Sequence, residues 1–355
     1  MLLQPEGDHP VLSSSIISYI PHFCQHLLLF TFACYLYIIE KISERQVFSM
    51  LQNLLVVTGQ VITLFLMMAV GYALVRLGKL TDLGLGQMSA LLLYVVSPCL
   101  VLDAFQQEGL PDGLTLAIGF GAVGLGYLIP MVLSAPLFPR QSPETRSALR
   151  FGCTYGNAGF MGMPLIQMIL GDGAVIYGAI AIALMNALHW SHGVILMGGK
   201  CSVKKAVVNP GVLPLLFALV LYAFHLRMPQ SVGAALDFLG SMNTPLAMVV
   251  IGGQMASVNP VSAFTQPRLY IAAAFRLLAM PALTAVLFLP LGLSPLLYCV
   301  CVILAATPTA GATGIFSQRF GRDTGTAAQM VTLSTLLSIL TLPIFAVIAQ
   351  TLAGF

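Results

Sequence analysis

Charged side chains are scarce in this sequence. Asp, Glu, Lys and Arg together make up 8% of the 355 residues, whereas hydrophobic residues make up 58%. Soluble domains carry about 25% charged residues, so this chain lacks the polar surface that a water-facing protein needs. Most of it must therefore be solvated by lipid. The formal net charge of +3 is small and dispersed along the chain, so nucleic acid is not an expected partner.

Motifs that carry enzymatic chemistry are also missing. The sequence contains no HExxH metal motif, no GxxxxGK[ST] phosphate-binding loop and no recognisable nucleophile–base pair. His189 and His192 have ligand-like spacing, but two histidines alone make a poor metal site. The seven cysteines are scattered through apolar stretches without redox or metal spacing. We therefore expect neither an enzyme nor an ATP-driven pump, and no bound cofactor or metal.

Long apolar stretches, by contrast, are abundant. A membrane-spanning helix needs about 20 mainly apolar residues, and short breaks rich in Gly, Pro and Asp separate ten such windows. The windows, numbered one to ten, are 54–75, 85–106, 114–137, 148–170, 174–197, 210–226, 232–256, 269–289, 295–316 and 326–352. The sequence therefore predicts an all-α membrane protein with about ten transmembrane helices and no second, soluble domain.

Lys and Arg are distributed unevenly between the breaks. Eleven of them lie in or beside the breaks that follow odd-numbered windows, and Arg227 alone follows an even-numbered window. Cytoplasmic loops carry the excess of Lys and Arg in membrane proteins. The odd breaks are therefore predicted to be cytoplasmic, which places both ends of the ten-helix core outside the cytoplasm.

The first 49 residues fit this scheme less well. Residues 16–39 are apolar enough for an eleventh helix but contain a proline and several polar side chains, and Met50 directly precedes the first window. Neither a basic segment nor a small-residue cleavage site marks a signal peptide. Two interpretations stay open. Residues 1–49 are either a dispensable extension from a misassigned start or an extra helix that places the N-terminus in the cytoplasm.

Prolines recur at matching places in the two halves of the chain. Three pairs lie 144 to 151 positions apart: Pro98 with Pro245, Pro130 with Pro281, and Pro164 with Pro308. This offset predicts two copies of a five-helix unit, residues 50–198 and 210–355, joined by a short basic loop at 199–209. Because five is odd, the second copy is inverted in the membrane, which is typical of secondary transporters.

Helix-breaking residues interrupt windows four and nine near their middles. Window four contains GNAGFMGMP at 156–164, and window nine contains ATPTAGATG at 306–314. Proline lacks an N–H donor and glycine tolerates unusual dihedrals, so both helices should unwind there. Unpaired peptide groups in hydrocarbon cost several kcal/mol each, so unwinding is tolerated only where protein, water or a ligand satisfies them.

Broken helices of this kind suit a negatively charged ligand. Each half-helix that follows a break presents free N–H groups and partial positive charge near the middle of the membrane. Two such ends would bind an anion without a buried lysine. Prolines that merely kink a helix are the alternative, but two matching clusters in two repeats favour a binding site.

Individual residues in and near the breaks are candidates for that site. Asn157 either donates to a substrate carboxylate or caps the unwound backbone. Thr307, Thr309 and Thr313 either contact the ligand or bond back to their own helix. Arg276 lies about eight residues into window eight, about 12 Å deep at 1.5 Å per residue, where an ionisable residue suggests function. Its side chain could instead extend to the interface.

Weaker candidates lie outside the two breaks. Ser97 and Thr244 stand beside another pair of matched prolines, and Asn186 is placed to line a pathway on window five. The candidate substrate-binding set is Gly156, Asn157, Gly159, Pro164, Thr307, Pro308, Thr309, Thr313, Ser97, Thr244, Asn186 and Arg276. Neither break contains a carboxylate, so coupling to Na⁺ or H⁺ stays open.

From about residue 53 to its C-terminus, the sequence resembles the auxin efflux carrier family and, within it, bacterial malonate- or malate-permease-like proteins. The matching stretches are Gly71-Tyr72, Arg76-Leu77-Gly78, Ser97-Pro98, 156–164, Asn209-Pro210, Thr244-Pro245-Leu246, Arg276-Leu277 with Pro281, and Ala306-Thr307-Pro308-Thr309. The chain lacks the long hydrophilic central loop of the long plant carriers, and its extension before Met50 also lies outside the pattern.

This resemblance implies a ten-helix fold of two inverted repeats, like that of bile-acid symporters, in which helices four and nine are broken and cross at their prolines. One part of such a fold is a scaffold, and the other moves like an elevator. The resemblance also implies a bacterial inner-membrane protein that transports carboxylates.

The sequence as a whole predicts a secondary transporter that moves a small organic anion, such as a mono- or dicarboxylate, by alternating access. Its expected partners are that anion and the lipid bilayer, and a homodimer is a further hypothesis. The alternative is a membrane sensor with a carrier-like domain. A sensor would normally need an output domain, and no soluble segment here is long enough for one.

Overall fold

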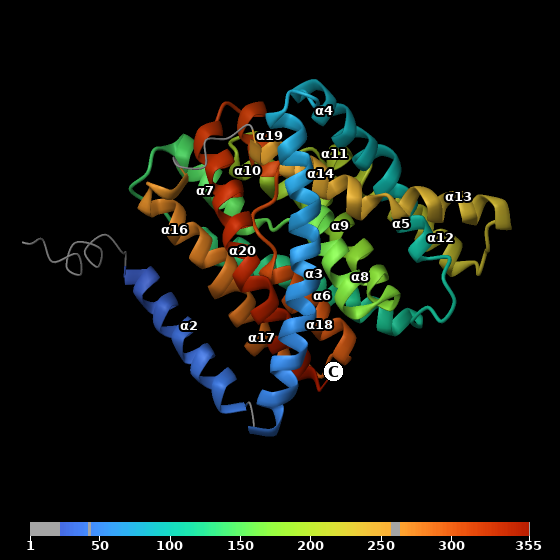
Figure 1. Ribbon diagram of the computed structural model, residues 1–355, viewed down its shortest axis with the longest axis horizontal. Helices are drawn as coiled ribbons and strands as arrows, with labels where there is room; N and C mark the ends of the chain where they lie inside the picture. Colours follow the sequence, from blue (N-terminus) through green and yellow to red (C-terminus); the bar gives the residue numbers. More distant parts are fainter. Residues whose placement is uncertain (1–21, 42–43, 257–262, 355) are drawn as a thin grey trace, which may run out of the picture.

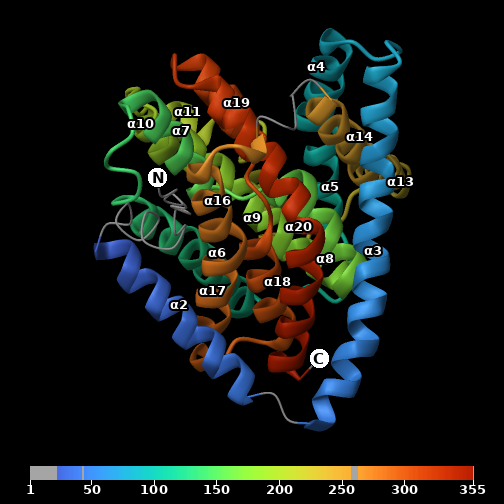
Figure 2. The ribbon, with the colours of Figure 1, turned by 60° about the vertical axis from the view of Figure 1, so that its left-hand side comes forward.

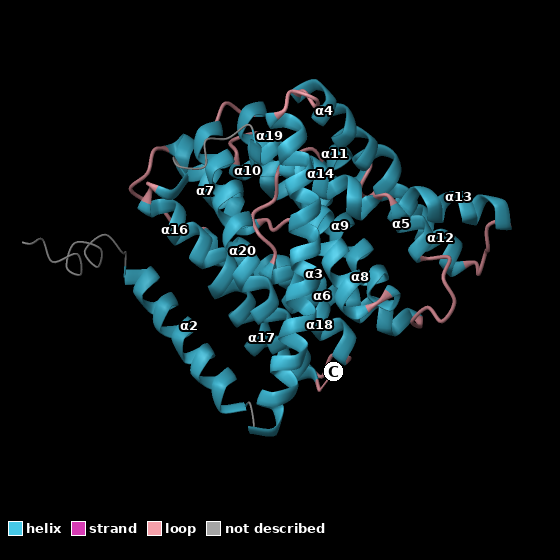
Figure 3. Ribbon diagram, viewed as in Figure 1, coloured by secondary structure: helices cyan, strands magenta, loops and turns pink. Residues whose placement is uncertain are grey.

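The computed structural model describes residues 22–41, 44–256 and 263–354. Within these ranges the regular structure is helical (Figure 3), and the β-type pairing is an isolated antiparallel bridge between Gly156 and Thr309. The prediction of an all-α protein is confirmed.

The five windows of the first half are occupied by helices whose ends follow the local sequence. Asp112 caps one of them by accepting a hydrogen bond from the Thr115 N–H at 2.7 Å, and Gly78 ends another with a positive φ of 67°. The elements are α3 (Glu44–Arg76), α4 (Asp82–Leu91), η1 (Leu92–Val96), α5 (Ser97–Ala104), α6 (Gly113–Ser134), α7 (Pro143–Thr154), η2 (Ala158–Gly162), α8 (Met163–Leu170), η3 (Asp172–Ala174), α9 (Val175–Leu188), η4 (His189–Gly193) and α10 (Val194–Leu196).

The second half has helices in all five remaining windows. Within the part of the chain that the structure describes, four short elements are π-helical turns, and each inserts into or adjoins a longer helix; they are η1, η2, η4 and η5. The elements are α11 (Val203–Val207), α12 (Leu213–Ala223), α13 (Gln230–Ser241), α14 (Asn243–Ala256), α16 (Pro267–Ala274), η5 (Phe275–Ala279), α17 (Met280–Phe288), η6 (Leu289–Leu291), α18 (Pro295–Ala306), α19 (Ala312–Arg319) and α20 (Thr324–Ala353).

Seven helical stretches in the described residues are long and apolar enough to cross a membrane, which makes the chain a multi-pass membrane protein. They are Asn53–Arg76, Asp82–Ala104, Gly113–Ser134, Asp172–Leu196, Gln230–Ala256, Pro267–Leu291 and Thr324–Ala353. Windows four, six and nine contain shorter apolar helices, and in windows four and nine the helix is interrupted. Outward-facing leucines such as Leu55 (76% exposed) and Leu340 (69%) suit a surface that lipid covers.

The helices pack in two groups that touch. In the first group α3 packs along α14, and α5 packs against α12 and α13. In the second group α18 packs against α17 and α20, α7 against α20, and α6 against α9. Figure 2 shows α3, α13 and α14 at the right and α16, α17, α18 and α20 to their left. The long helix α20 also packs against α3, so it joins the groups.

Helices α3 and α14 approach each other closely at two glycines. A Cβ added at Gly71 would overlap the carbonyl oxygen of Val249, and one added at Gly252 would overlap that of Met68. The two backbones are therefore in direct contact, which small residues permit in membrane helices.

Helix α2 (His22–Lys41) lies against the outside of the second group (Figures 1 and 2). The Tyr35 hydroxyl donates to the Leu278 carbonyl at 3.4 Å, and its ring lies 6.2 Å from that of Phe345. Residues 1–21 and 42–43 lie outside the described part. Whether residues 1–49 belong to the mature protein stays a prediction.

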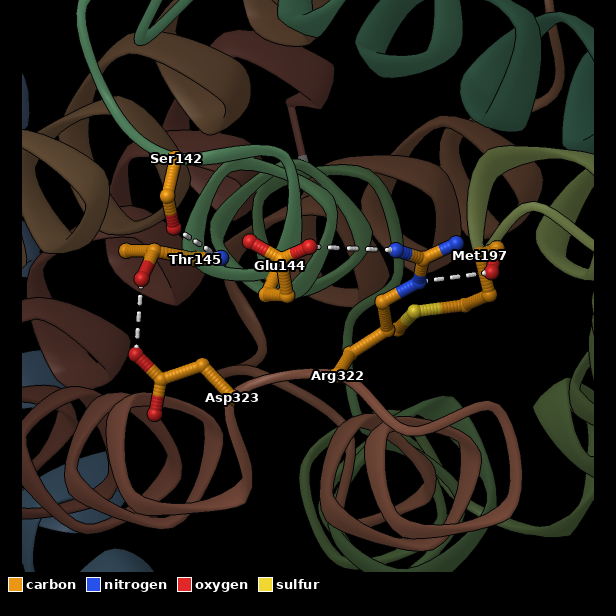
Figure 4. A network of polar contacts seen from close by, with 6 residues as sticks. All are labelled: Ser142, Glu144, Thr145, Met197, Arg322 and Asp323. Atoms are coloured by element: carbon orange, nitrogen blue, oxygen red, sulfur yellow. Dashed lines mark hydrogen bonds and ion pairs between the residues drawn. The ribbon is translucent and has the colours of Figure 1, made fainter.

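A polar network joins the ends of three helices of the second group (Figure 4). Arg322 donates to the Met197 carbonyl at 2.8 Å and lies 3.9 Å from the Glu144 carboxylate. Asp323 accepts hydrogen bonds from the Thr145 hydroxyl at 2.7 Å and from the Thr326 N–H at 2.9 Å. The starts of α7 and α20 are thereby tied to the end of α10.

Asp323 should be a stabilising residue in this network. Burial raises the pKa of its carboxyl, but hydrogen bonds from Thr326 and Thr145 and the nearby Arg268 guanidinium outweigh burial, so the pKa lies below its usual value. Its contribution is therefore present above the unfolded pKa of about 4 and lost as the pH falls through the lower folded pKa.

We expect Asp323→Ala to lower the free energy of unfolding by about 1–2 kcal/mol, as loss of a helix cap does. Thermal unfolding in detergent at pH 7 measures this effect. Asp112→Ala is the matched control, because it removes a cap that makes no link to a second helix, and its effect should be smaller. An equal loss of melting temperature in both variants would show that the link to Thr145 adds nothing.

Candidate functional site

Two unwound segments lie inside the helical bundle, where the sequence predicts them. Helix α7 ends at Thr154 and α8 begins at Met163, with an extended segment and the π-helical turn η2 between them. Helix α18 ends at Ala306 and α19 begins at Ala312. Figure 3 shows loop segments in the interior of the bundle as well as at its ends. The backbone of Thr307 is extended, as a residue before proline prefers.

The two breaks satisfy each other's backbone groups. The Asn157 N–H donates to the Pro308 carbonyl at 2.7 Å, and the Ala310 N–H donates to the Tyr155 carbonyl at 3.0 Å. Between these bonds lies the antiparallel bridge of Gly156 and Thr309. Because hydrocarbon offers no partner to a free peptide group, this pairing explains how both helices can be open so deep in the protein.

Side chains complete the crossing. The Thr309 hydroxyl donates to the Gly152 carbonyl at 3.2 Å, and the Ser334 hydroxyl of α20 accepts the Thr309 N–H at 3.1 Å. The Asn157 side-chain oxygen accepts the Phe160 N–H at 3.2 Å, so this amide caps the turn that follows the break. Among the described residues its NH₂ group has no hydrogen-bond partner, which leaves a donor beside the crossing.

Arg276 lies at the same place. It is 4% exposed, and its Nε donates to the Thr307 carbonyl at 2.9 Å. Its Nη2 donates to the Leu304 carbonyl at 3.1 Å and to the Thr307 hydroxyl at 3.2 Å. The alternative that this side chain extends to the membrane interface is wrong, because the guanidinium turns inward and braces the second break.

The Arg276 charge has no acidic partner in the part of the chain that the structure describes, since no Asp or Glu oxygen lies within 4.0 Å of it. Its Nη1 makes no hydrogen bond there. A buried cation is costly in free energy unless it is paired. The crossing therefore combines a fixed positive charge with free N–H donors and no anion of the protein's own.

A small cavity adjoins this charge. Its volume is about 30 Å³, and it is lined by Val123, Gly126, Tyr127, Gly156, Ala158, Arg276, Cys301, Leu304 and Ala305. One water needs about 10–15 Å³ by this measure, so the cavity holds about two or three waters and is too small for a dicarboxylate in this conformation. The Tyr127 hydroxyl donates to the Ala181 carbonyl at 3.0 Å, which fixes one wall.

The predicted residues fall into three places. The crossing brings together Gly156, Asn157, Thr307, Pro308, Thr309 and Arg276, and the flanking Gly159, Pro164 and Thr313 belong to the turns and helices that continue from it. Ser97 contacts Asn243 at 3.5 Å, beside Thr244, where α5 and α14 begin. Asn186 donates to the Ile182 carbonyl of its own helix and lines a different cavity.

Sequence reasoning missed several lining residues, chiefly Tyr127 and Cys301. Tyr127 lies three positions before Pro130 on a glycine-rich helix, which is the sequence signal that could have indicated it. Cys301 carries no such signal, because a cysteine in an apolar helix is usually a packing residue.

Comparison with known proteins agrees with this picture. A family model described as "Membrane transport protein" matches residues 56–200 and 198–346. A Rhizobium meliloti (strain 1021) protein named "Putative malonate transporter" is 26% identical over 303 residues, which cover 80% of this chain and 93% of that relative.

Proposed function

Because the chain belongs to the membrane transport protein family, which includes the auxin efflux carriers, we propose that it is a secondary transporter for a small organic anion. The substrate we propose is a mono- or dicarboxylate, with malonate as the first candidate because of the name that the Rhizobium meliloti relative carries. The observation that carries the proposal is the buried Arg276 guanidinium, which has no carboxylate partner among the described residues and lies where two broken helices cross.

A bound anion would supply the negative charge that the described residues of this site lack. The Arg276 Nη1, which has no partner among the described residues, the side-chain NH₂ of Asn157 and the helix that begins at Ala158 (η2, continuing into α8) all favour a negative charge nearby. A carboxylate accepts several such hydrogen bonds at once. In the present conformation the cavity admits only about two or three waters, so the substrate enters only after the walls separate, as alternating access requires.

The arrangement of helices supports the ten-helix, two-repeat fold as part of this proposal. Windows four and nine do not count as single spans because each is broken, yet the halves of each together occupy a window of spanning length. The two packed groups match a scaffold (α3, α4, α5, α12, α13 and α14) and a moving part that contains both breaks. The basic breaks face the cytoplasm of a bacterial inner membrane in this proposal.

Counterflow in proteoliposomes tests the proposed function. Purified protein is reconstituted with unlabelled malonate, malate or an indole acid inside, and uptake of the labelled compound is followed. Saturable exchange of at least one carboxylate is expected. Saturable binding without exchange would favour the sensor alternative, and neither binding nor exchange across the panel, with incorporation verified, would reject the proposal.

Asn157→Ala and Pro308→Ala test the site itself. Each should reduce exchange strongly, and Asn157→Ala by about tenfold or more, because a hydrogen bond to a charged group contributes about 1.5–3 kcal/mol. Asn53→Ala, at the start of the spanning part of α3, is the control for loss of an amide and should retain exchange. Full exchange by both site variants at equal membrane abundance would contradict a site at the crossing.

A further inference from the structure

A second and larger cavity lies apart from the crossing. Its volume is about 300 Å³, which is the lower end of the range for ligand sites. The cavity is lined by Leu93, Tyr94, Asn186, Trp190, Lys205, Val208, Asn209, Pro210 and Arg319. These residues come from both helix groups, because the first two belong to η1 and the others to the segment from α9 to the loop after α11 and to the end of α19.

The charge of this cavity is of one sign. Lys205 and Arg319 line it, and none of its lining residues is acidic. In the described residues no carboxylate oxygen lies within 4.0 Å of either cation. Both residues lie in breaks that the distribution of Lys and Arg predicts to be cytoplasmic, and α11 and α19 lie at the same end of the bundle (Figures 1 and 2).

Specific contacts hold the residues around these cations in place. Arg319 is held over the Trp190 ring at 4.9 Å from its centroid. Asn209 is 5% exposed, and its side chain accepts the Gly211 and Val212 N–H groups, both at 3.0 Å, while donating to the Ala206 carbonyl at 2.8 Å. This bonding fixes the end of α11, which carries Lys205, and the following Val208 beside α9 and η4, the segment that carries Trp190.

We propose that this cavity is a second anion-binding site, which takes up the transported carboxylate at the cytoplasmic mouth before it reaches the crossing. The inference rests on the proposed function. The carboxylate lies between Lys205 and Arg319, and the apolar part of the anion lies against Trp190 and Tyr94. A cavity with one sign of charge raises the local concentration of the opposite ion, so this site lowers the substrate concentration at which transport half-saturates.

Trp190 makes the site directly observable, because it is the single tryptophan of the chain. Protein in neutral phosphatidylcholine nanodiscs is titrated with malonate while tryptophan emission is recorded. A saturable change is expected. Lys205→Gln should weaken the apparent affinity at least threefold, and Lys205→Gln with Arg319→Gln at least tenfold. The neighbouring Lys204→Gln, which does not line the cavity, should match the wild type.

Two further arms separate this site from the crossing. Asn157→Ala, which impairs exchange, should retain the fluorescence response to malonate. In proteoliposomes, Lys205→Gln should raise the KM for malonate offered on the side of the basic breaks at least threefold and leave both the limiting rate and the KM from the opposite side unchanged. Arg319→Lys should restore the affinity that Arg319→Gln loses.

The outcomes are distinguishable. Equal malonate affinity in the wild type and the double variant would overturn the second site. The titration is repeated in nanodiscs that contain anionic phosphatidylglycerol, and a change in tryptophan emission that depends on this lipid and not on malonate would also overturn it. An unchanged KM despite weakened binding would overturn its role in loading. The protein could also show the expected fluorescence response but exchange no carboxylate in proteoliposomes. That result would reject the transport proposal and retain an anion site in this cavity.

Discussion

Gly156→Ala is expected to abolish exchange while leaving membrane insertion intact. A Cβ at this position would overlap the Arg276 Nη2 atom and the Thr307 hydroxyl. Neither neighbour can move without losing contacts, because the guanidinium is held by two hydrogen bonds to Thr307 and one to Leu304 in the last turn of α18. The added methyl therefore displaces the charge or separates the breaks, and misplacement by about 1 Å can reduce a rate about a hundredfold.

Gly159→Ala is the matched control, three residues further along the same break. The nearest atoms to a Cβ there are in Ile182 and Met185 at 3.8 Å, an ordinary contact distance. Initial rates of malonate counterflow at equal protein density measure both variants. Exchange within a few-fold of wild type is expected for Gly159→Ala, and the same result for Gly156→Ala would show that the close approach to Arg276 is not needed.

Arg276→Lys is expected to reduce exchange at least about thirtyfold although it keeps the positive charge. Lysine offers a point charge on a flexible stem and cannot make the forked contacts to Thr307 and Leu304. Disrupting a buried, hydrogen-bonded charge costs about 2–5 kcal/mol, and each 1.4 kcal/mol corresponds to a factor of ten. Arg276→Gln, which removes the charge as well, should exchange dianions even more slowly than Arg276→Lys does.

Arg268→Lys is the control on the same helix. Arg268 donates to Gln266, Gln141 and Thr326, away from the crossing, so exchange should stay within about threefold of wild type. Thermal unfolding of each variant separates loss of function from loss of fold. A stable Arg276→Lys protein with wild-type KM and limiting rate would remove Arg276 from the site and with it the main support for the proposed function.

The positions of the two breaks were predictable because they follow from covalent chemistry. Pro308 lies in the second break and leaves its backbone without a donor, and glycine gives the first break, at 155–157, its freedom at Gly156, whereas Pro164 is the second residue of the regular helix α8. The mutual pairing of the breaks, which the family resemblance implies, depends on two segments about 150 residues apart meeting in space. Periodicity and composition contain no information about that meeting.

The orientation of Arg276 was not predictable from depth alone. Counting 1.5 Å per residue locates a side chain along the helix axis but not around it, and Arg276 lies in the π-helical turn η5. A π turn inserts a residue and rotates all that follows, so an ideal helix gives the wrong face. Asn186, on α9, lines the larger cavity instead of the crossing, and its position along the chain alone could not show which of the two it faces.

The hydrogen bonds between the breaks also have a consequence for biogenesis. The peptide groups of Tyr155 and Asn157 find their partners in Pro308 and Ala310, which leave the ribosome about 150 residues later. At about 5–20 residues per second, the first half waits roughly 8–30 s in the bilayer with those groups open. During that interval water or the insertion machinery must satisfy them, so the nascent chain is most vulnerable to degradation before the ninth window is made.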